Sequence, residues 1–193
     1  MKKFFSIDLK EKINGEGACK LFYRIKFLFI SFKVKTHYKN NKIILDYNGK
    51  TYNLTPKQAK KKFSINVVFN GDYNVLKINN IISKKCLERS NFVFNGCHSE
   101  IYFKGENYGI WNISCYNNHN KVCIGQRTRC CDIGISAINN EIHIGEDCRI
   151  SNNVRIWGDG HSVLDAKTKK VINLPTKPIV IGNHVWLGEH DFQ

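Results

Sequence analysis

The feature that most constrains the fold of this chain is a short motif that occurs four times in its C-terminal half. Each copy places a variable residue between two apolar ones and ends in glycine: Val122-Cys-Ile-Gly125, Ile142-His-Ile-Gly145, Ile179-Val-Ile-Gly182 and Val185-Trp-Leu-Gly188. The last two copies are six residues apart, and isoleucine recurs in steps of six at Ile144, Ile150 and Ile156. A period of six fits neither an α-helix, with about 3.6 residues per turn, nor simple strand alternation. It is typical of a parallel β-helix with three-sided coils, so we expect an all-β triangular solenoid.

Less regular runs of β-favouring residues precede these motifs and are separated by Asn, Gly and Ser. They predict earlier, bulkier coils at Ile65–Phe69, Val75–Ile78, Phe92–Phe94, Ile101–Phe103 and Ile110–Ile113. Asparagine and glycine suit the corners between sides because they adopt left-handed backbone angles at low cost.

The region before residue 63 has a different character. Asn48-Gly49 separates two β-favouring runs and tolerates the positive φ angles of a type I′ turn, which predicts a hairpin over residues 42–54. Thr55 followed by Pro56 predicts the start of a short basic helix that reaches Lys62. The apolar but basic segment 21–34 fits either a buried strand or an amphipathic helix. We favour a helix that covers the first coil, because solenoid ends need caps.

The spacing of the motifs breaks once. Gly145 and Gly182 are 37 residues apart, about one coil plus a further 19 residues. The excess predicts an inserted loop over residues 157–178, which contains Asp159-Gly-His161. We therefore expect a small basic α+β N-terminal region over residues 1–62, followed by a solenoid over residues 63–193 with this loop at one corner.

The net charge of +14 is concentrated at the N-terminus. Residues 1–62 hold 16 Lys/Arg against 4 Asp/Glu, whereas the remaining 131 residues hold 14 against 12. Such asymmetry fits contact with anionic lipid or nucleic acid, although a solvated lysine-rich surface explains it equally well. The basic region lacks helix-turn-helix, zinc-finger and RNP signatures, so we do not expect a nucleic-acid partner.

The eight cysteines form no CxxC pair, and no secretory leader precedes them. We expect reduced thiols and a cytoplasmic protein, with most of the cysteines acting as small buried residues inside the coils. Zinc-site spacing is absent. No run of about 20 apolar residues, the length needed to span a bilayer, occurs in the sequence.

The segment from Ile144 to Asp165, followed by Lys177–Gly188, resembles the hexapeptide-repeat acyltransferase family. Within that family the similarity is closest to sugar and surface-polysaccharide O-acetyltransferases. It is specific over residues 120–188, weak over residues 64–119 and absent from residues 1–62. The resemblance implies a left-handed β-helix, a homotrimer, and acetyl-CoA bound in a groove between subunits.

The resemblance also implies roles for single residues. The family's catalytic histidine falls on His161, as general base, with Asp159 or Asp165 orienting its imidazole. Asn183, Trp186 and Gly188 fall where acyl-CoA is contacted. The competing readings are a solvent-exposed loop histidine, aspartates that only shape turns, and a tryptophan on the outer face of a coil. His143 and His184 are expected to face outward.

The predicted function is acetyl-CoA-dependent O-acetylation of a sugar hydroxyl on a surface glycan or its lipid-linked precursor, with possible peripheral contact to the inner membrane through the basic region. One alternative is a γ-type carbonic anhydrase, with His143 and His161 among three zinc ligands. Another is an inactive solenoid scaffold. Family members continue with further coils after the position of Gly188, whereas five residues follow it here, so we expect a truncated and impaired C-terminal end.

Overall fold

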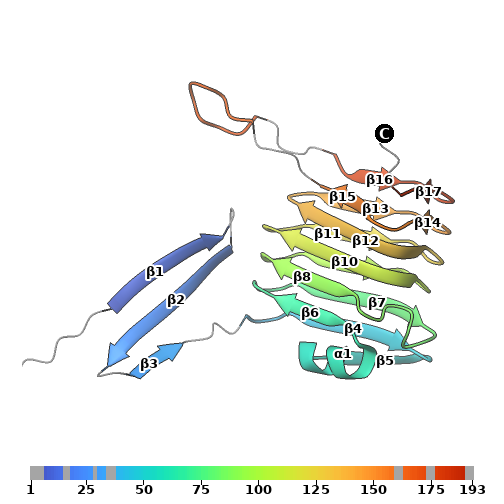
Figure 1. The fold of residues 1–193 in the computed structure, drawn as a ribbon, viewed down its shortest axis with the longest axis horizontal. Helices are drawn as coiled ribbons and strands as arrows, with labels where there is room; N and C mark the ends of the chain where they lie inside the picture. Colours follow the sequence, from blue (N-terminus) through green and yellow to red (C-terminus); the bar gives the residue numbers. More distant parts are fainter. Residues whose placement is uncertain are drawn as a thin grey trace, which may run out of the picture.

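The computed structural model describes residues 7–14, 18–27, 30–33, 38–158, 163–172 and 177–189, with side chains described from residue 38 onward. From residue 38 the chain forms a parallel β-solenoid of about four turns, with one short helix at its N-terminal end (Figure 1). The solenoid predicted from the six-residue period is confirmed.

Two stacked sheets run the length of the solenoid. The first sheet contains β4 (Lys42–Tyr47), β7 (Val75–Ile81), β9 (Glu100–Phe103), β11 (Lys121–Ile124), β13 (Glu141–Ile144) and β16 (Ile179–Ile181). The second sheet contains β6 (Asn66–Phe69), β8 (Asn91–Asn95), β10 (Tyr108–Tyr116), β12 (Arg129–Ile138), β14 (Arg149–Ile150) and β17 (Trp186–Leu187). Neighbouring strands within each of these two sets are parallel.

The last complete coil has three sides. Its strands are β13, β14 and β15 (Val154–Trp157), and β12 on the rung below pairs with β14 through its start and with β15 through its later part. Coil length varies along the stack. Val75 lies beside Glu100, Glu100 beside Lys121 and Lys121 beside Glu141, which gives steps of 25, 21 and 20 residues.

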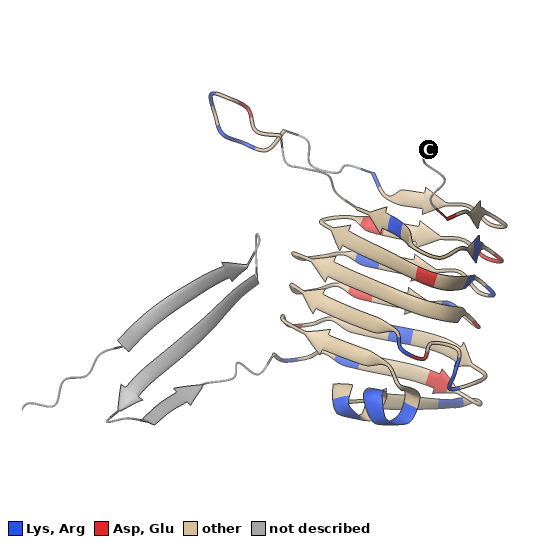
Figure 2. Cartoon of the chain, viewed as in Figure 1, with Lys and Arg blue, Asp and Glu red and all other residues tan. Residues whose placement is uncertain are grey.

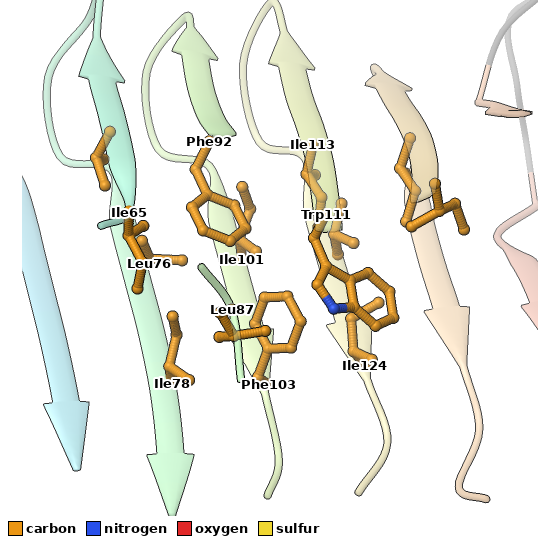
Figure 3. Packing of buried hydrophobic residues seen from close by; sticks show 14 of the residues in the cluster. Ile65, Leu76, Ile78, Leu87, Phe92, Ile101, Phe103, Trp111, Ile113 and Ile124 are labelled. Carbon is orange, nitrogen blue, oxygen red and sulfur yellow. The ribbon is translucent and has the colours of Figure 1, made fainter. Parts of the chain in front are cut away.

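Alternate residues of each strand point into the solenoid and make its core. In β9, Ile101 and Phe103 are buried while Glu100 is exposed. The middle coils are filled by aromatic rings: Phe103 packs edge-to-face against Trp111 at 5.2 Å and against Phe92 at 5.8 Å between ring centroids (Figure 3). Later coils are filled by Ile133, Ile135, Ile142, Ile144 and Cys148. This change from bulky to aliphatic filling explains why the repeat is regular only in the later coils.

The predicted hairpin and helix are confirmed at the N-terminal end. β4 pairs with antiparallel β5 (Lys50–Leu54), and Asn48 and Gly49 between them have φ values of 49° and 70°. Helix α1 (Pro56–Phe63) begins at Thr55, which forms a reciprocal capping box with Gln58. β4 also pairs with β7, so the solenoid sheet begins before the boundary that the sequence predicts at residue 63.

The helix predicted over residues 21–34 is wrong. This segment forms β2 (Ala18–Phe27) and β3 (Ile30–Lys33), which pair antiparallel with each other, and β1 (Ile7–Asn14) pairs with β2. The aromatic and β-branched residues of the segment favour strands when partner strands are available. No helix in the described ranges is long and apolar enough to cross a membrane.

The motif glycines lie where successive rungs approach most closely. A Cβ atom on Gly125 would lie 2.4 Å from the carbonyl carbon of Gly145 on the next rung. A Cβ atom on Gly145 would lie 2.6 Å from that of Gly182. At Gly182, nothing in the described structure lies within 4 Å of the same atom. The glycines at the first two positions are therefore required by packing between rungs.

We expect Gly125→Ala to lower the free energy of unfolding by about 2 kcal/mol, because the methyl group forces two rungs apart. Gly182→Ala, at the equivalent position of the last described rung, should change it by less than about 1 kcal/mol. Urea denaturation followed by circular dichroism measures both values. Equal losses in the two variants would contradict the packing argument.

The cysteine thiols differ in exposure. Cys115 is completely buried, and burial raises the pKa of its thiol to about 12. Burial also raises the pKa of Cys130, whereas its neighbour Cys131 is exposed. In the folded protein, iodoacetamide should modify Cys131 long before Cys115, because the thiolate is the reactive form. Tandem mass spectrometry of peptides taken over time measures the order, and modification of both at one rate would refute it.

Candidate functional site

The candidate site is the corner at which the inserted loop leaves the solenoid. The loop follows β15 and returns to β16, so it replaces the corner that precedes the strands of the first sheet. His161 and Asp159 lie outside the described residues, as do residues 160 and 162. The structure therefore defines the base of the loop, the hairpin within it and the rung that follows.

A column of buried polar side chains runs up the inside of this corner. The Ser99 backbone N–H donates to Asn74 Oδ1 at 3.0 Å, and the Asn120 backbone N–H donates to Ser99 Oγ at 3.2 Å. The Asn140 backbone N–H donates to Asn120 Oδ1 at 3.2 Å. Each side chain thus satisfies an amide one rung above it, which a buried turn needs.

The column ends at the base of the loop. Asn140 Nδ2 donates to the Gly158 carbonyl oxygen at 2.9 Å, and the Gly158 backbone N–H donates to Ser136 at 2.7 Å. Gly158 immediately precedes Asp159. The sequence shows Asn140 at a repeat corner but does not show that it holds the residue next to the candidate catalytic segment. The recurrence of asparagine two positions before Val122 and Ile142 is the signal that could have identified it.

Within the insertion, residues 163–172 form a small hairpin closed by a bridge between Leu164 and Val171. Asp165 Oδ1 accepts hydrogen bonds from the Thr168 backbone N–H at 2.6 Å, the Thr168 hydroxyl at 2.8 Å and the Lys167 backbone N–H at 3.1 Å. These bonds, chiefly those from Thr168, hold the pKa of Asp165 below its usual value. The carboxylate therefore shapes the turn of this hairpin.

The rung after the loop carries the three residues predicted to contact acyl-CoA. Asn183 Oδ1 accepts from the Glu146 backbone N–H at 2.9 Å and so joins this rung to the one below. Trp186 is 77% exposed, and its indole N–H reaches Ser151 Oγ at 3.4 Å. Nothing in the described structure lies within 4 Å of a Cβ built on Gly188. The rung thus presents a large aromatic surface to solvent beside a position without a side chain.

Charged groups stack at the opposite end of the first-sheet strands. Arg127 binds Asp147 on the next rung through two hydrogen bonds of 2.8 and 2.7 Å, and this pairing lowers the pKa of Asp147. On the outer face of β13, His143 Nε2 lies 2.9 Å from Glu141 Oε2. Among the residues that the structure describes, no three His, Cys, Asp or Glu side chains are grouped to hold a metal ion.

Sequence reasoning missed an exposed column of rings at the candidate corner. Tyr73, His98 and His119 have φ values of 58°, 54° and 59°, and each stands two residues before a first-sheet strand. Their rings stack at centroid distances of 4.9 and 5.1 Å. Asn139 occupies the next rung with a φ of 50°, directly below the loop. The column was hidden because bulky residues rarely adopt positive φ.

Comparison of the chain with protein-family models, curated proteins and solved structures gives no match.

We expect Asn140→Ala to loosen the loop, because the Gly158 carbonyl loses its donor. Loss of this bond and its buried partner should reduce stability by about 1 to 2 kcal/mol. Limited proteolysis should then cut the insertion faster than in the unmodified protein, with cleavage sites read by mass spectrometry. Asn53→Ala, on the exposed face of β5, is the matched control. Unchanged cleavage in Asn140→Ala would contradict the anchoring role.

Proposed function

We infer that this protein is an O-acetyltransferase that moves an acetyl group from acetyl-CoA to a hydroxyl of a surface glycan or its precursor. The reading depends on the resemblance of residues 120–188 to the sugar O-acetyltransferases of the hexapeptide-repeat family. The observation that carries it is the position of the insertion, which leaves a pinned corner of the solenoid just before Asp159-Gly-His161. A rigid scaffold that presents a reactive loop is a common arrangement in enzymes.

His161 is the proposed general base. Its neutral imidazole accepts the proton of the sugar hydroxyl as that oxygen attacks the thioester carbonyl carbon. The tetrahedral intermediate then expels the CoA sulfur, which takes the proton back from the imidazolium. Histidine suits both steps because it changes protonation state near neutral pH. Backbone N–H groups at a coil corner are the proposed donors to the oxyanion.

The aspartates divide between two roles in this proposal. Asp165 is held by Thr168 and Lys167 in the turn of the hairpin, which supports a structural part in shaping the loop. Asp159, two residues before His161, is then the better candidate to orient the imidazole. A carboxylate that accepts a hydrogen bond from one ring nitrogen fixes the tautomer and leaves the other nitrogen free to act as base.

The rung β16–β17 is the proposed wall of the acyl-CoA site. The exposed indole of Trp186 offers an apolar face to the pantetheine arm, and the open position at Gly188 lets a ligand approach the backbone. Asn183 supports this wall by tying it to Glu146 on the preceding rung. As in the family that the chain resembles, the groove would be completed by a neighbouring subunit of a homotrimer.

The test measures thiol release from acetyl-CoA over a panel of sugar acceptors. His161→Ala should lower kcat by roughly a hundredfold to ten-thousandfold, the usual effect of removing a general base. His143→Ala is the matched control, because His143 contacts Glu141 on the outer face of β13 and should be dispensable.

The same assay, repeated on a version with C-terminal coils added, separates a damaged enzyme from a wrong assignment. Transfer activity that survives His161→Ala in the extended version would refute the base. Absence of transfer in every version, with the fold intact by circular dichroism, would favour the scaffold alternative. Loss of a zinc-dependent activity in His143→Ala would favour the carbonic anhydrase alternative.

A further inference from the structure

We propose that the N-terminal end of the solenoid is a docking surface for an anionic membrane. The surface is the basic cap, defined as helix α1 and the loop of residues 82–89. This proposal is independent of acetyl transfer, because it concerns the end of the solenoid farthest along the stack from the inserted loop (Figure 1).

Charge is divided sharply along the solenoid. Residues 38–89 contain eleven Lys and Arg against three Asp and Glu. Residues 90–158, which form the following coils, contain six of each. The positive potential is therefore a property of the first two coils and not of the whole body.

The cap brings two basic segments together. Helix α1 has Lys60, Lys61 and Lys62 in its last turn and no acidic residue in its first turn (Figure 2). The Arg89 backbone N–H donates to the carbonyl oxygen of Ser64, the residue that ends the helix, at 3.1 Å. This bond holds the loop that carries Lys84 and Lys85 against the helix. All of these cationic side chains are exposed.

These charges are not neutralised by the described part of the chain. Within residues 38–158, 163–172 and 177–189, ion pairs involve only Arg127 and His143. Two nearby acids are engaged elsewhere: Asp46 accepts from the Thr51 hydroxyl, and Asp72 accepts from the Lys39 backbone N–H. Lys62 extends over the Tyr52 ring at 5.3 Å, which keeps its ammonium group at the surface. The cap is thus free to bind an anionic partner.

The N-terminal sheet indicates a lipid partner rather than a nucleic acid. Its register places nearly all of the apolar residues of the three strands on one face, together with Glu11: Ile7, Leu9, Ile13, Cys19, Leu21, Tyr23, Ile25, Phe27, Ile30 and Phe32. The other face holds six cationic positions: Lys10, Lys12, Lys20, Arg24, Lys26 and Lys33. Separate apolar and cationic faces suit the boundary between acyl chains and head groups. Exposed Ile82 adds an apolar residue to the cap itself.

The test is flotation of the full chain with lipid vesicles. The protein should float with vesicles that contain phosphatidylglycerol, should stay behind with pure phosphatidylcholine, and should be released by high salt. Changing Lys57, Lys60, Lys61 and Lys62 together to Gln should weaken binding by roughly a hundredfold. Glutamine keeps helix propensity, so α1 should persist, and a thermal melt checks it.

The matched control changes four exposed lysines of the insertion, Lys167, Lys169, Lys170 and Lys177, to Gln, and it should float like the unmodified protein. Equal loss in the two variants would show a general charge effect and overturn the proposal. So would failure to float at low salt, release by inorganic phosphate, or tighter binding to duplex DNA or RNA than to the vesicles.

Discussion

The rest of the structure depends on the vertical register of the rungs. Parallel strands stack about 4.8 Å apart, and at every corner the backbone must turn while remaining buried. The amides at one corner are satisfied by side chains from the rung below, through Asn74, Ser99 and Asn120. At another corner, Asn107 and Thr128 do the same for Thr128 and Cys148. These columns keep successive coils aligned although the coils differ in length.

The same register explains where the chain tolerates an insertion. A loop that leaves and returns at one corner leaves the strand ladders above and below it intact, because β16 still pairs with β13 and β17 with β14. The bond from Asn140 to Gly158 fixes the point of departure. Stability and chemistry are therefore separated: the ladders carry the fold, and the loop can vary to suit its substrate.

The two ends of the solenoid present different chemistry. The basic cap lies on the first coils, whereas the loop and the exposed Trp186 belong to the last ones. If the cap rests on an anionic surface, the stack of coils would hold the loop away from it by the height of the solenoid. A precursor glycan that extends from the membrane would suit this arrangement.

Local signals in the sequence were sufficient for the local structure. The six-residue period, Asn48-Gly49 and Thr55-Pro56 each determine backbone geometry over a few residues, and the solenoid, the hairpin and α1 follow from them. The assignment of His161 is likewise a reading of a motif and rests on sequence alone. Segment 21–34 was misread because a β-favouring apolar run takes its structure from the strands that pair with it.

Only the tertiary structure decided which residues lie one rung apart. Coil steps of 25, 21 and 20 residues give no constant spacing from which to pair them. The Tyr73–His98–His119 stack, the Arg127–Asp147 pair and the anchor at Asn140 were therefore not readable in advance. The sequence by itself determined that this chain coils and that one corner carries a histidine loop. The stacking of the coils decided which side chains meet, because contacts between rungs depend on register across the whole ladder and not on neighbours along the chain.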